Sequence, residues 1–314
     1  MNTKQGVVRK VDKDMKSYSL KQVMTNAAQT SAAVRELRAE ELQELKNVLT
    51  EMVLDVLHVC EAHGFSLMLA GGSALGAVRH QGFIPWDDDL DLMMTREDYV
   101  KFCAIFEQTL GDKYLLIAPN HGELYQTRFP KIMKRNTVLR SITDVDSPML
   151  CGIYLDVFLL ENIPANRFIQ RMKGLWCNLL MFIGSRVYLY ERNNPVFQAH
   201  MSGTEEAQRA LKATLRIGKA FSMIPSRKWS DWVDKAVQYK KETGLLGLPT
   251  GRKHYFGEIL NKSAFLPPSY GTFEGHRVPL PADCDAYLRN LYGDYMQIPP
   301  VDKREKHFIV ELQF

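Results

Sequence analysis

The sequence predicts an α/β protein of the α+β type, in which helices flank a mixed sheet and a mainly helical region is appended. Short apolar runs at 65–70 and 90–94 enclose a small helix, and further strand-like runs follow over 114–160; together these predict the sheet. The appended region is predicted by residues 166–243, where the spacing becomes helical with several amphipathic stretches.

The first half of this pattern can be assigned in chain order. A polar arm over about 1–30 precedes a long helix at 32–63, whose apolar residues recur at threes and fours and which Gly64 should end. The strand at 65–70 leads through a tight Gly71-Gly72-Ser73 turn into a short helix at 74–79, and the strand at 90–94 follows.

A second helix and several strands complete the predicted α/β part. Thr95 followed by Asp98 predicts a capped helix over 97–110, with Gly111 as its stop. Candidate strands then lie at 114–118, 126–133 and 137–139, with a turn at 135–136. The last candidate strand is the apolar run at 152–160, which a single charge interrupts.

The overall composition is that of an ordinary globular protein. The chain has 314 residues, of which 46% are hydrophobic, and its net charge of +4 is too small for a dedicated nucleic-acid binder. Five scattered cysteines without a metal-binding spacing predict reduced thiols in a cytosolic protein.

The sequence predicts no membrane-spanning segment. The N-terminus has no apolar run of signal-peptide length, so we expect a cytoplasmic protein. The most apolar stretch, Leu175–Leu189, is short and broken by polar residues, which favours a buried core helix over a membrane span. An interfacial helix stays open as an alternative, as does peripheral association with the inner membrane face.

The most informative part of the chain is a cluster of aspartates after the glycine turn. Asp89 and Asp91 point the same way if the strand alternates, and hard carboxylate ligands favour Mg²⁺ or Mn²⁺. Asp87 has the same parity but follows Pro85-Trp86 in a predicted loop, and Asp88 should point away. The alternative for a run of aspartates is an exposed acidic turn.

Two further features suit a phosphate ester beside the metal. Gly72 and Ser73 can offer backbone N–H groups, and the Ser73 hydroxyl, to phosphate at a helix N-terminus. Asp156 interrupts an apolar strand, where a charge is costly unless it is paired or binds a metal.

The string GGSALGAVRHQGFIPWDDDLDL resembles the active-site signature of the nucleotidyltransferase superfamily, and in particular the LicD family, which includes the fukutin-type transferases. The block from Arg79 to Asp89 fits that family's pattern without a gap. The resemblance implies a nucleotidyltransferase-like sheet and a carboxylate triad of Asp89, Asp91 and Asp156 that holds two metal ions. It also implies that Asp156 can receive the proton of the acceptor hydroxyl.

The same resemblance assigns basic and C-terminal residues. Lys131, in RFPKIMKRNT, matches a basic position that could neutralise a diphosphate. Arg79 could bind phosphate or pair with the acidic loop. The string LYGDYMQIPPVDKREKH resembles a block that closes the substrate pocket, with Tyr292, Tyr295, Lys303 and His307 as candidates; packing or surface charge is the alternative for each.

These assignments predict four parts of the chain: an arm at 1–30, a catalytic core at 31–165, a helical acceptor region at 166–250, and a segment at 251–314 that packs back onto the site. The resemblance is weak over 166–250.

The function implied by the resemblance is transfer of phosphocholine from CDP-choline to a sugar hydroxyl of a surface glycan, such as teichoic acid or lipopolysaccharide, with release of CMP. The acceptor could be lipid-linked. Aromatic faces would bind the quaternary ammonium group through cation–π attraction. The candidates near the site are Phe83, Trp86, Tyr154, Phe158, Tyr292 and Tyr295.

Three alternatives remain at this point. The enzyme could transfer another phosphoalcohol, such as ribitol or glycerol phosphate, from its CDP carrier. It could be a nucleotidyltransferase that uses a nucleoside triphosphate, although the modest charge argues against an RNA substrate. It could also be a non-catalytic binding protein, against which stands the presence of all three carboxylates.

Overall fold

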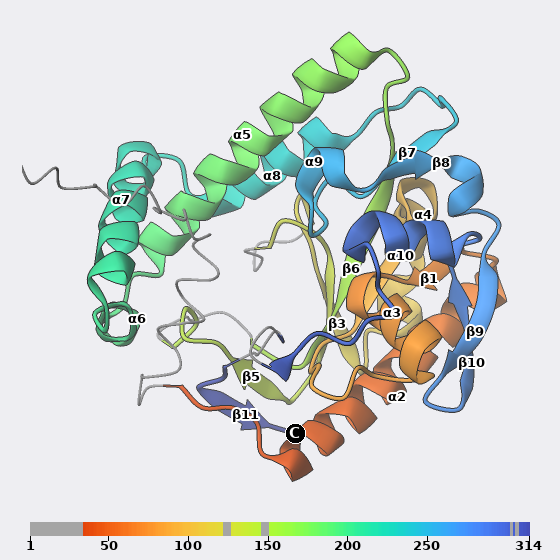
Figure 1. Cartoon of the computed structure of the whole chain (residues 1–314), viewed down its shortest axis with the longest axis horizontal. Helices are drawn as coiled ribbons and strands as arrows, with labels where there is room; N and C mark the ends of the chain where they lie inside the picture. The colour runs from red at the N-terminus through yellow and green to blue at the C-terminus, as the bar shows by residue number, and fades with distance from the viewer. Residues whose placement is uncertain (1–33, 122–126, 146–150, 302–303, 305–307) are drawn as a thin grey trace, which may run out of the picture.

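The computed structural model describes residues 34–121, 127–145, 151–301, 304 and 308–314 (Figure 1). It confirms the predicted α+β class, with a mixed sheet, helices around it and a helical region to one side. The helices are α2 (Ala39–His63), α3 (Gly71–His80), α4 (Arg96–Thr109), α5 (Arg167–Glu191), α6 (Pro195–Met201), α7 (Glu205–Phe221), α8 (Ser226–Val237), α9 (His254–Gly257) and α10 (Cys284–Tyr292). The strands are β1 (Leu67–Leu69), β2 (Asp91–Thr95), β3 (Tyr114–Ile117), β4 (Lys131–Lys134), β5 (Val138–Arg140), β6 (Tyr154–Asn162), β7 (Leu245–Gly247), β8 (Ile259–Asn261), β9 (Ser269–Phe273), β10 (His276–Leu280) and β11 (Glu311–Gln313).

The main sheet has the order β1-β2-β6-β4-β3, and β7 and β8 extend it from the far end of β6. Only β2 and β6 pair in parallel; the other pairs in this sheet are antiparallel. The parallel pair is possible because α4 and the β3–β4 hairpin lie between the two strands in sequence. β6 is therefore the central strand, with β2 on one side and β4 on the other.

The long N-terminal helix is confirmed from Ala39 onward. Its buried residues from Leu45 to Cys60 follow the predicted spacing, and Gly64 ends it in the left-handed conformation at φ 71°. The prediction of a start at residue 32 was wrong for the described residues before Arg38, which are extended; Arg35 forms a β-bridge with Ile309. The predicted arm at 1–30 lies outside the described residues.

Other boundaries shift by a few residues. Thr95 caps α4 as predicted, since its side chain accepts a hydrogen bond from the Asp98 N–H at 3.1 Å. The predicted strand at 126–133 begins only at Lys131, because β4 is confined to the residues that pair with β3 and β6. All five cysteines lie in the described part of the chain, and none forms a disulfide.

The helical region lies to one side of the sheet, where α5 crosses α7 and α8 (Figure 1). Arg96 on α4 joins it to the sheet: its guanidinium donates to Glu161 on β6 at 2.8 Å and to Asp234 on α8 at 2.8 Å. Asn120 adds a second tie, donating to the Asp234 carboxylate at 2.9 Å. This buried ion network sets the position of α8 against the sheet.

The helix over Leu175–Leu189 is not the buried core helix that the sequence favours. One face of α5 packs on α8 through Cys177, Leu180 and Met181, but the other face leaves Leu175 and Trp176 more than half exposed. The physical reason is that α5 has apolar side chains on two of its faces and its neighbours cover only one of them. None of the helices in the described part of the chain is long and apolar enough to cross a membrane.

The C-terminal part packs at the opposite end, where α10 and the β9–β10 hairpin lie beside α3 (Figure 1). Phe265, Phe273, Tyr287 and Leu288 belong to the same hydrophobic core as α2 and β1.

Candidate active site

Three charged side chains form a row across the middle of the sheet. Asp91 on β2 is the direct register partner of Asp156 on β6, and Asp156 is the direct partner of Lys131 on β4. Residues that are directly opposite on neighbouring strands project from the same face of a sheet. Two residues that the sequence assigned by different arguments, Asp91 and Asp156, are thereby brought side by side.

Lys131 is held firmly in this row. Its Nζ donates to Asp156 Oδ1 at 2.6 Å and lies 3.4 Å from the centre of the Tyr154 ring. Burial lowers the pKa of Lys131, but the Asp156 carboxylate and Tyr154 outweigh that effect and raise it above its ordinary value. Lys131 is therefore a fixed cation at neutral pH, with a carboxylate on one side and an aromatic face on the other.

The aspartates before β2 belong to a loop. β2 begins only at Asp91, so strand alternation does not determine where Asp89 points. Oxygens of Asp87, Asp88 and Asp89 lie within 4.8 Å of one another, a spacing at which carboxylates can share a cation. The expectation that Asp88 points away from its neighbours was therefore wrong, because a loop has no two-residue alternation.

Asp91 lies in a strongly negative environment. Burial, together with repulsion from Asp89, Asp156 and Asp87, raises its pKa well above the ordinary value, and Lys131 opposes this only in part. Such crowding of carboxylates is costly unless a proton or a cation neutralises it. Oxygen ligands of this kind suit Mg²⁺ or Mn²⁺. Among the described residues the oxygens of Asp87, Asp88 and Asp89 lie together, and Asp91 is the register partner of Asp156.

The Gly-Gly-Ser sequence is the first turn of α3, not a turn before it. A Cβ on Gly71 would lie 2.6 Å from Asp91 Oδ2, and one on Gly72 would lie 2.9 Å from Asp87 Oδ2. Only glycine lets the backbone of the helix N-terminus approach both carboxylates so closely. The first-turn N–H groups at Gly72 and Ser73 lack helical acceptors, so this end of α3 can bind phosphate oxygens.

Ser73 lies at the N-terminus of α3, as predicted, and its side chain also contacts the start of β2. Its buried Oγ accepts a hydrogen bond from the backbone N–H of Asp91 at 2.8 Å. The hydroxyl thus fixes the start of β2 against α3, and the distance between the glycine turn and Asp91 follows from this contact.

Residues far away in sequence hold the acidic loop, and sequence reasoning missed them. Lys46 on α2 donates to the carbonyls of Ile84 at 3.3 Å and Pro85 at 3.0 Å, and Glu274 accepts from the N–H of Phe83 at 3.0 Å. Burial lowers the pKa of Lys46, while Asp87 and Glu274 oppose that shift. No local pattern marks these two residues, because their partners lie in other parts of the chain.

The C-terminal part reaches the site through α10 and the segment after it. The Tyr287 hydroxyl accepts a hydrogen bond from the Gly71 N–H at 3.0 Å, a contact that the sequence did not indicate. Arg79 donates to the backbone carbonyl of Tyr295 at 2.7 Å, and the Tyr295 hydroxyl donates to Asp285 at 2.8 Å. Arg79 and Tyr295 therefore join α3 to the C-terminal part. Lys303 and His307 lie outside the described residues.

The aromatic candidates fall into different surroundings. Phe83 is buried against Phe273, and Phe158 packs on Phe129. Tyr154 covers Lys131, and the Arg304 guanidinium lies 4.0 Å from the centre of the Trp86 ring. The remaining candidate, Tyr292, is near Asp91 and Asp87, and burial raises its pKa.

The site residues lie largely within a segment that matches a known protein family. Residues 64–138 match the family model described as LicD/FKTN/FKRP, nucleotidyltransferase domain. This range contains the glycine turn, the acidic loop, β2 and Lys131.

Similar proteins extend the match beyond that domain. The chain is 26% identical over 269 residues to the lipopolysaccharide cholinephosphotransferase LicD of Haemophilus influenzae, an alignment that covers 82% of this chain and 93% of the relative. It is also 50% identical over 50 residues to the ribitol 5-phosphate transferase FKRP of human and mouse, which covers 16% of this chain and 10% of the relative. The chain therefore contains a segment that matches the LicD/FKTN/FKRP nucleotidyltransferase domain, and it is similar over most of its length to a lipopolysaccharide cholinephosphotransferase.

Proposed function

We propose that this protein transfers phosphocholine from CDP-choline to a sugar hydroxyl of a surface glycan and releases CMP. The observation that carries the proposal is the row of Asp91, Asp156 and Lys131 beside the N-terminus of α3. It occurs in a chain that aligns with nearly the full length of a lipopolysaccharide cholinephosphotransferase.

A divalent metal is part of the proposal. Asp89, Asp91 and Asp156 would hold one or two Mg²⁺ or Mn²⁺ ions; Asp91 and Asp156 are register partners, and Asp87 and Asp88 lie close to Asp89. The metal would neutralise the charge of the diphosphate and polarise its oxygens. The raised pKa of Asp91 supports this role, because burial and the neighbouring carboxylates both disfavour its charged form and a cation would offset both effects.

The chain's own residues would bind and orient the diphosphate. The first-turn N–H groups at Gly72 and Ser73 would donate to its oxygens, and Lys131 would supply a fixed positive charge. Asp156, whose Oδ1 accepts a hydrogen bond from Lys131, would receive the proton of the attacking hydroxyl.

Phosphocholine transfer requires attack at the β-phosphorus. A bond forms from the acceptor oxygen to that atom, the bond from the β-phosphorus to the bridging oxygen breaks, and CMP leaves. The donor must therefore lie with its choline end toward the acceptor, which requires recognition of both the cytidine and the choline. Transfer of a nucleotide would instead need attack at the α-phosphorus.

A second candidate is transfer of ribitol phosphate from CDP-ribitol. The 50% identity to the ribitol 5-phosphate transferase FKRP over 50 residues favours it, although that match is short. The two reactions share every catalytic residue proposed above and differ in the pocket for the alcohol.

The test is CMP release from CDP-choline with Mn²⁺ or Mg²⁺ and a lipopolysaccharide or teichoic acid acceptor, compared with CDP-ribitol, CDP-glycerol and CTP. Asp91→Asn and Asp156→Asn should each abolish release. Asp112→Asn, a change at an exposed aspartate beyond α4, should not affect it.

Selective, metal-dependent release from CDP-choline supports the proposal. Turnover of CDP-ribitol alone would move the assignment to the second candidate. Pyrophosphate formed from CTP, or CMP release that survives both substitutions, would refute the proposed reaction.

A further inference from the structure

α5 carries an apolar stripe that the protein leaves uncovered. Its side chains recur at helical spacing from Phe168 to Phe182 and are 44–74% exposed. They are Phe168, Met172, Leu175, Trp176, Leu179 and Phe182. Scattered exposed apolar residues are ordinary, but a continuous stripe on one helix marks an interaction surface.

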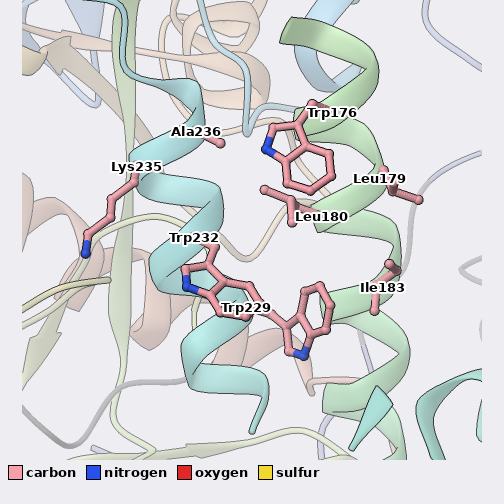
Figure 2. A pocket seen from close by; sticks show the side chains of 8 residues that line it. All are labelled: Trp176, Leu179, Leu180, Ile183, Trp229, Trp232, Lys235 and Ala236. Carbon is pink, nitrogen blue, oxygen red and sulfur yellow. The ribbon is translucent and has the colours of Figure 1, made fainter. Parts of the chain in front are cut away.

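The stripe continues onto α8 through an apolar groove. Figure 2 shows the indole rings of Trp176, Trp229 and Trp232 in the space between the two helices, with Leu179 and Ile183 on the α5 side. The groove measures about 570 Å³. Lys235, also on its α8 wall, points away from these rings (Figure 2).

Positive charge accompanies this apolar surface. No Asp or Glu occurs between Asn162 and Tyr190, whereas Arg167 and Arg171 are exposed on the first turns of α5. From Arg167 to Val237 the chain has twelve Lys and Arg against five Asp and Glu, a net charge of +7, and the rest of the chain therefore carries −3 of the total of +4.

We propose that the stripe on α5 and the groove beside it dock the protein on an anionic lipid bilayer. A helix with Trp, Phe and Leu on one face and Arg or Lys beside it lies in the plane of a membrane surface, with its apolar side chains among the acyl chains. Tryptophan prefers this depth because its ring is apolar and its N–H is polar. The basic residues add attraction to anionic headgroups.

The charge distribution favours a bilayer over a second copy of the chain. A two-fold dimer through this face would bring together two copies of a positively charged segment, 167–190, which has no Asp or Glu to pair with the basic residues of the other copy. Like charges that meet in an interface oppose association. An anionic membrane, in contrast, gains from both the apolar stripe and the surrounding charge.

The experiment measures sedimentation of the whole protein with vesicles of phosphatidylcholine alone, or of phosphatidylcholine and phosphatidylglycerol in equal amounts. Leu175→Glu/Leu179→Glu places two charges in the stripe. Val100→Glu is the matched control, because Val100 is 61% exposed on α4, away from α5. Light scattering gives the oligomeric state of each variant, and circular dichroism its thermal unfolding.

The wild type and Val100→Glu should bind the anionic vesicles and bind neutral ones more weakly. Leu175→Glu/Leu179→Glu should bind at least about tenfold more weakly, since two leucines lose their burial in the bilayer. If the double variant unfolds, a second measurement replaces it: vesicles should shift the tryptophan fluorescence of the wild type to shorter wavelength, and less so in Trp176→Phe.

Three results would overturn the proposal: no binding of the wild type to anionic vesicles, equal binding by a folded double variant, or a wild-type dimer that the double variant dissociates. The last would assign the face to a second copy of the chain. Because these readouts involve no donor or acceptor, the outcome is independent of the proposed reaction.

Discussion

Gly71 offers a sharp test of the site, because two separate effects of a side chain at this position can be distinguished. Its φ of 47° is in the left-handed region, and a Cβ there would lie 2.6 Å from Asp91 Oδ2. Gly64 also has a positive φ, 71°, but a Cβ there would meet nothing within 4 Å. Gly71→Ala therefore adds strain and a collision, whereas Gly64→Ala adds strain alone.

The expected magnitudes follow from this difference. A left-handed conformation costs a non-glycine residue about 1–2 kcal/mol, so both variants should lose roughly that much free energy of unfolding. In Gly71→Ala the Asp91 carboxylate must also move, or the first turn of α3 must withdraw from it. A displacement of about 1 Å at a catalytic group lowers turnover about 100-fold, so this variant alone should lose activity on that scale.

The assay combines urea unfolding, Mn²⁺ binding and CMP release for the wild type and both variants. Gly64→Ala should be destabilised with wild-type Mn²⁺ affinity and turnover, and Gly71→Ala should lose both. Gly72→Ala adds a third case, since a Cβ there would approach Asp87 Oδ2 at 2.9 Å without a positive φ. If folded Gly71→Ala binds Mn²⁺ and turns over donor as well as Gly64→Ala does, the assignment of Asp91 to the metal is refuted.

The remaining predictions concern the charges around the site. Lys131→Met should lower CMP release about 100- to 1000-fold, because a fixed charge near the reacting phosphate is lost. Lys134→Met should not, because Lys134 is three residues further along β4, on the opposite face, and pairs with Glu51; equal turnover in both variants would contradict the role of Lys131. Arg96→Met should cost about 3–5 kcal/mol of unfolding free energy in urea titrations, because it leaves Glu161 and Asp234 buried without their cation. Arg209→Met, which breaks an exposed pair, should cost at most about 1 kcal/mol, and similar losses in the two would show that the buried network is dispensable. Mn²⁺ affinity should fall on acidification at pH values well above 3.8, the ordinary aspartate pKa, because burial and repulsion from Asp89, Asp156 and Asp87 raise the pKa of Asp91 and protons compete with the metal there. Because the folded-state pKa of Asp91 is raised, the stability of the metal-free protein is highest at low pH and falls as the pH rises through that pKa. Asp91→Asn should make the melting temperature fall less over this pH range. An unchanged pH profile of the melting temperature would exclude Asp91 as the source of the loss.

Much of the local structure was predictable because it depends on neighbours in sequence. The spacing of Leu45 to Cys60 predicted the buried face of α2, Gly64 its end, and Thr95 the cap of α4. Each of these rests on interactions within one or two turns of the chain.

Predictions failed in two places. Strand alternation was extended into a loop, and an apolar helix was expected to be covered by its neighbours on all sides. Asp88 and Asp89 lie in a loop held by Lys46 and Glu274, so strand alternation did not apply to them. The apolar helix α5 looked like core, but α7 and α8 cover only part of it.

The residues available for chemistry could be identified from local patterns: the Gly-Gly-Ser string, the aspartates around Asp89, the charge at Asp156 inside an apolar run, and the family that these resemble. Three features became visible only in the folded chain: Asp91, Asp156 and Lys131 lie side by side, the Tyr287 hydroxyl accepts a hydrogen bond from Gly71, and α5 exposes an apolar face. The reason is physical. Strand register and helix packing are settled by contacts between residues far apart in the chain, and no local pattern of side chains records those contacts.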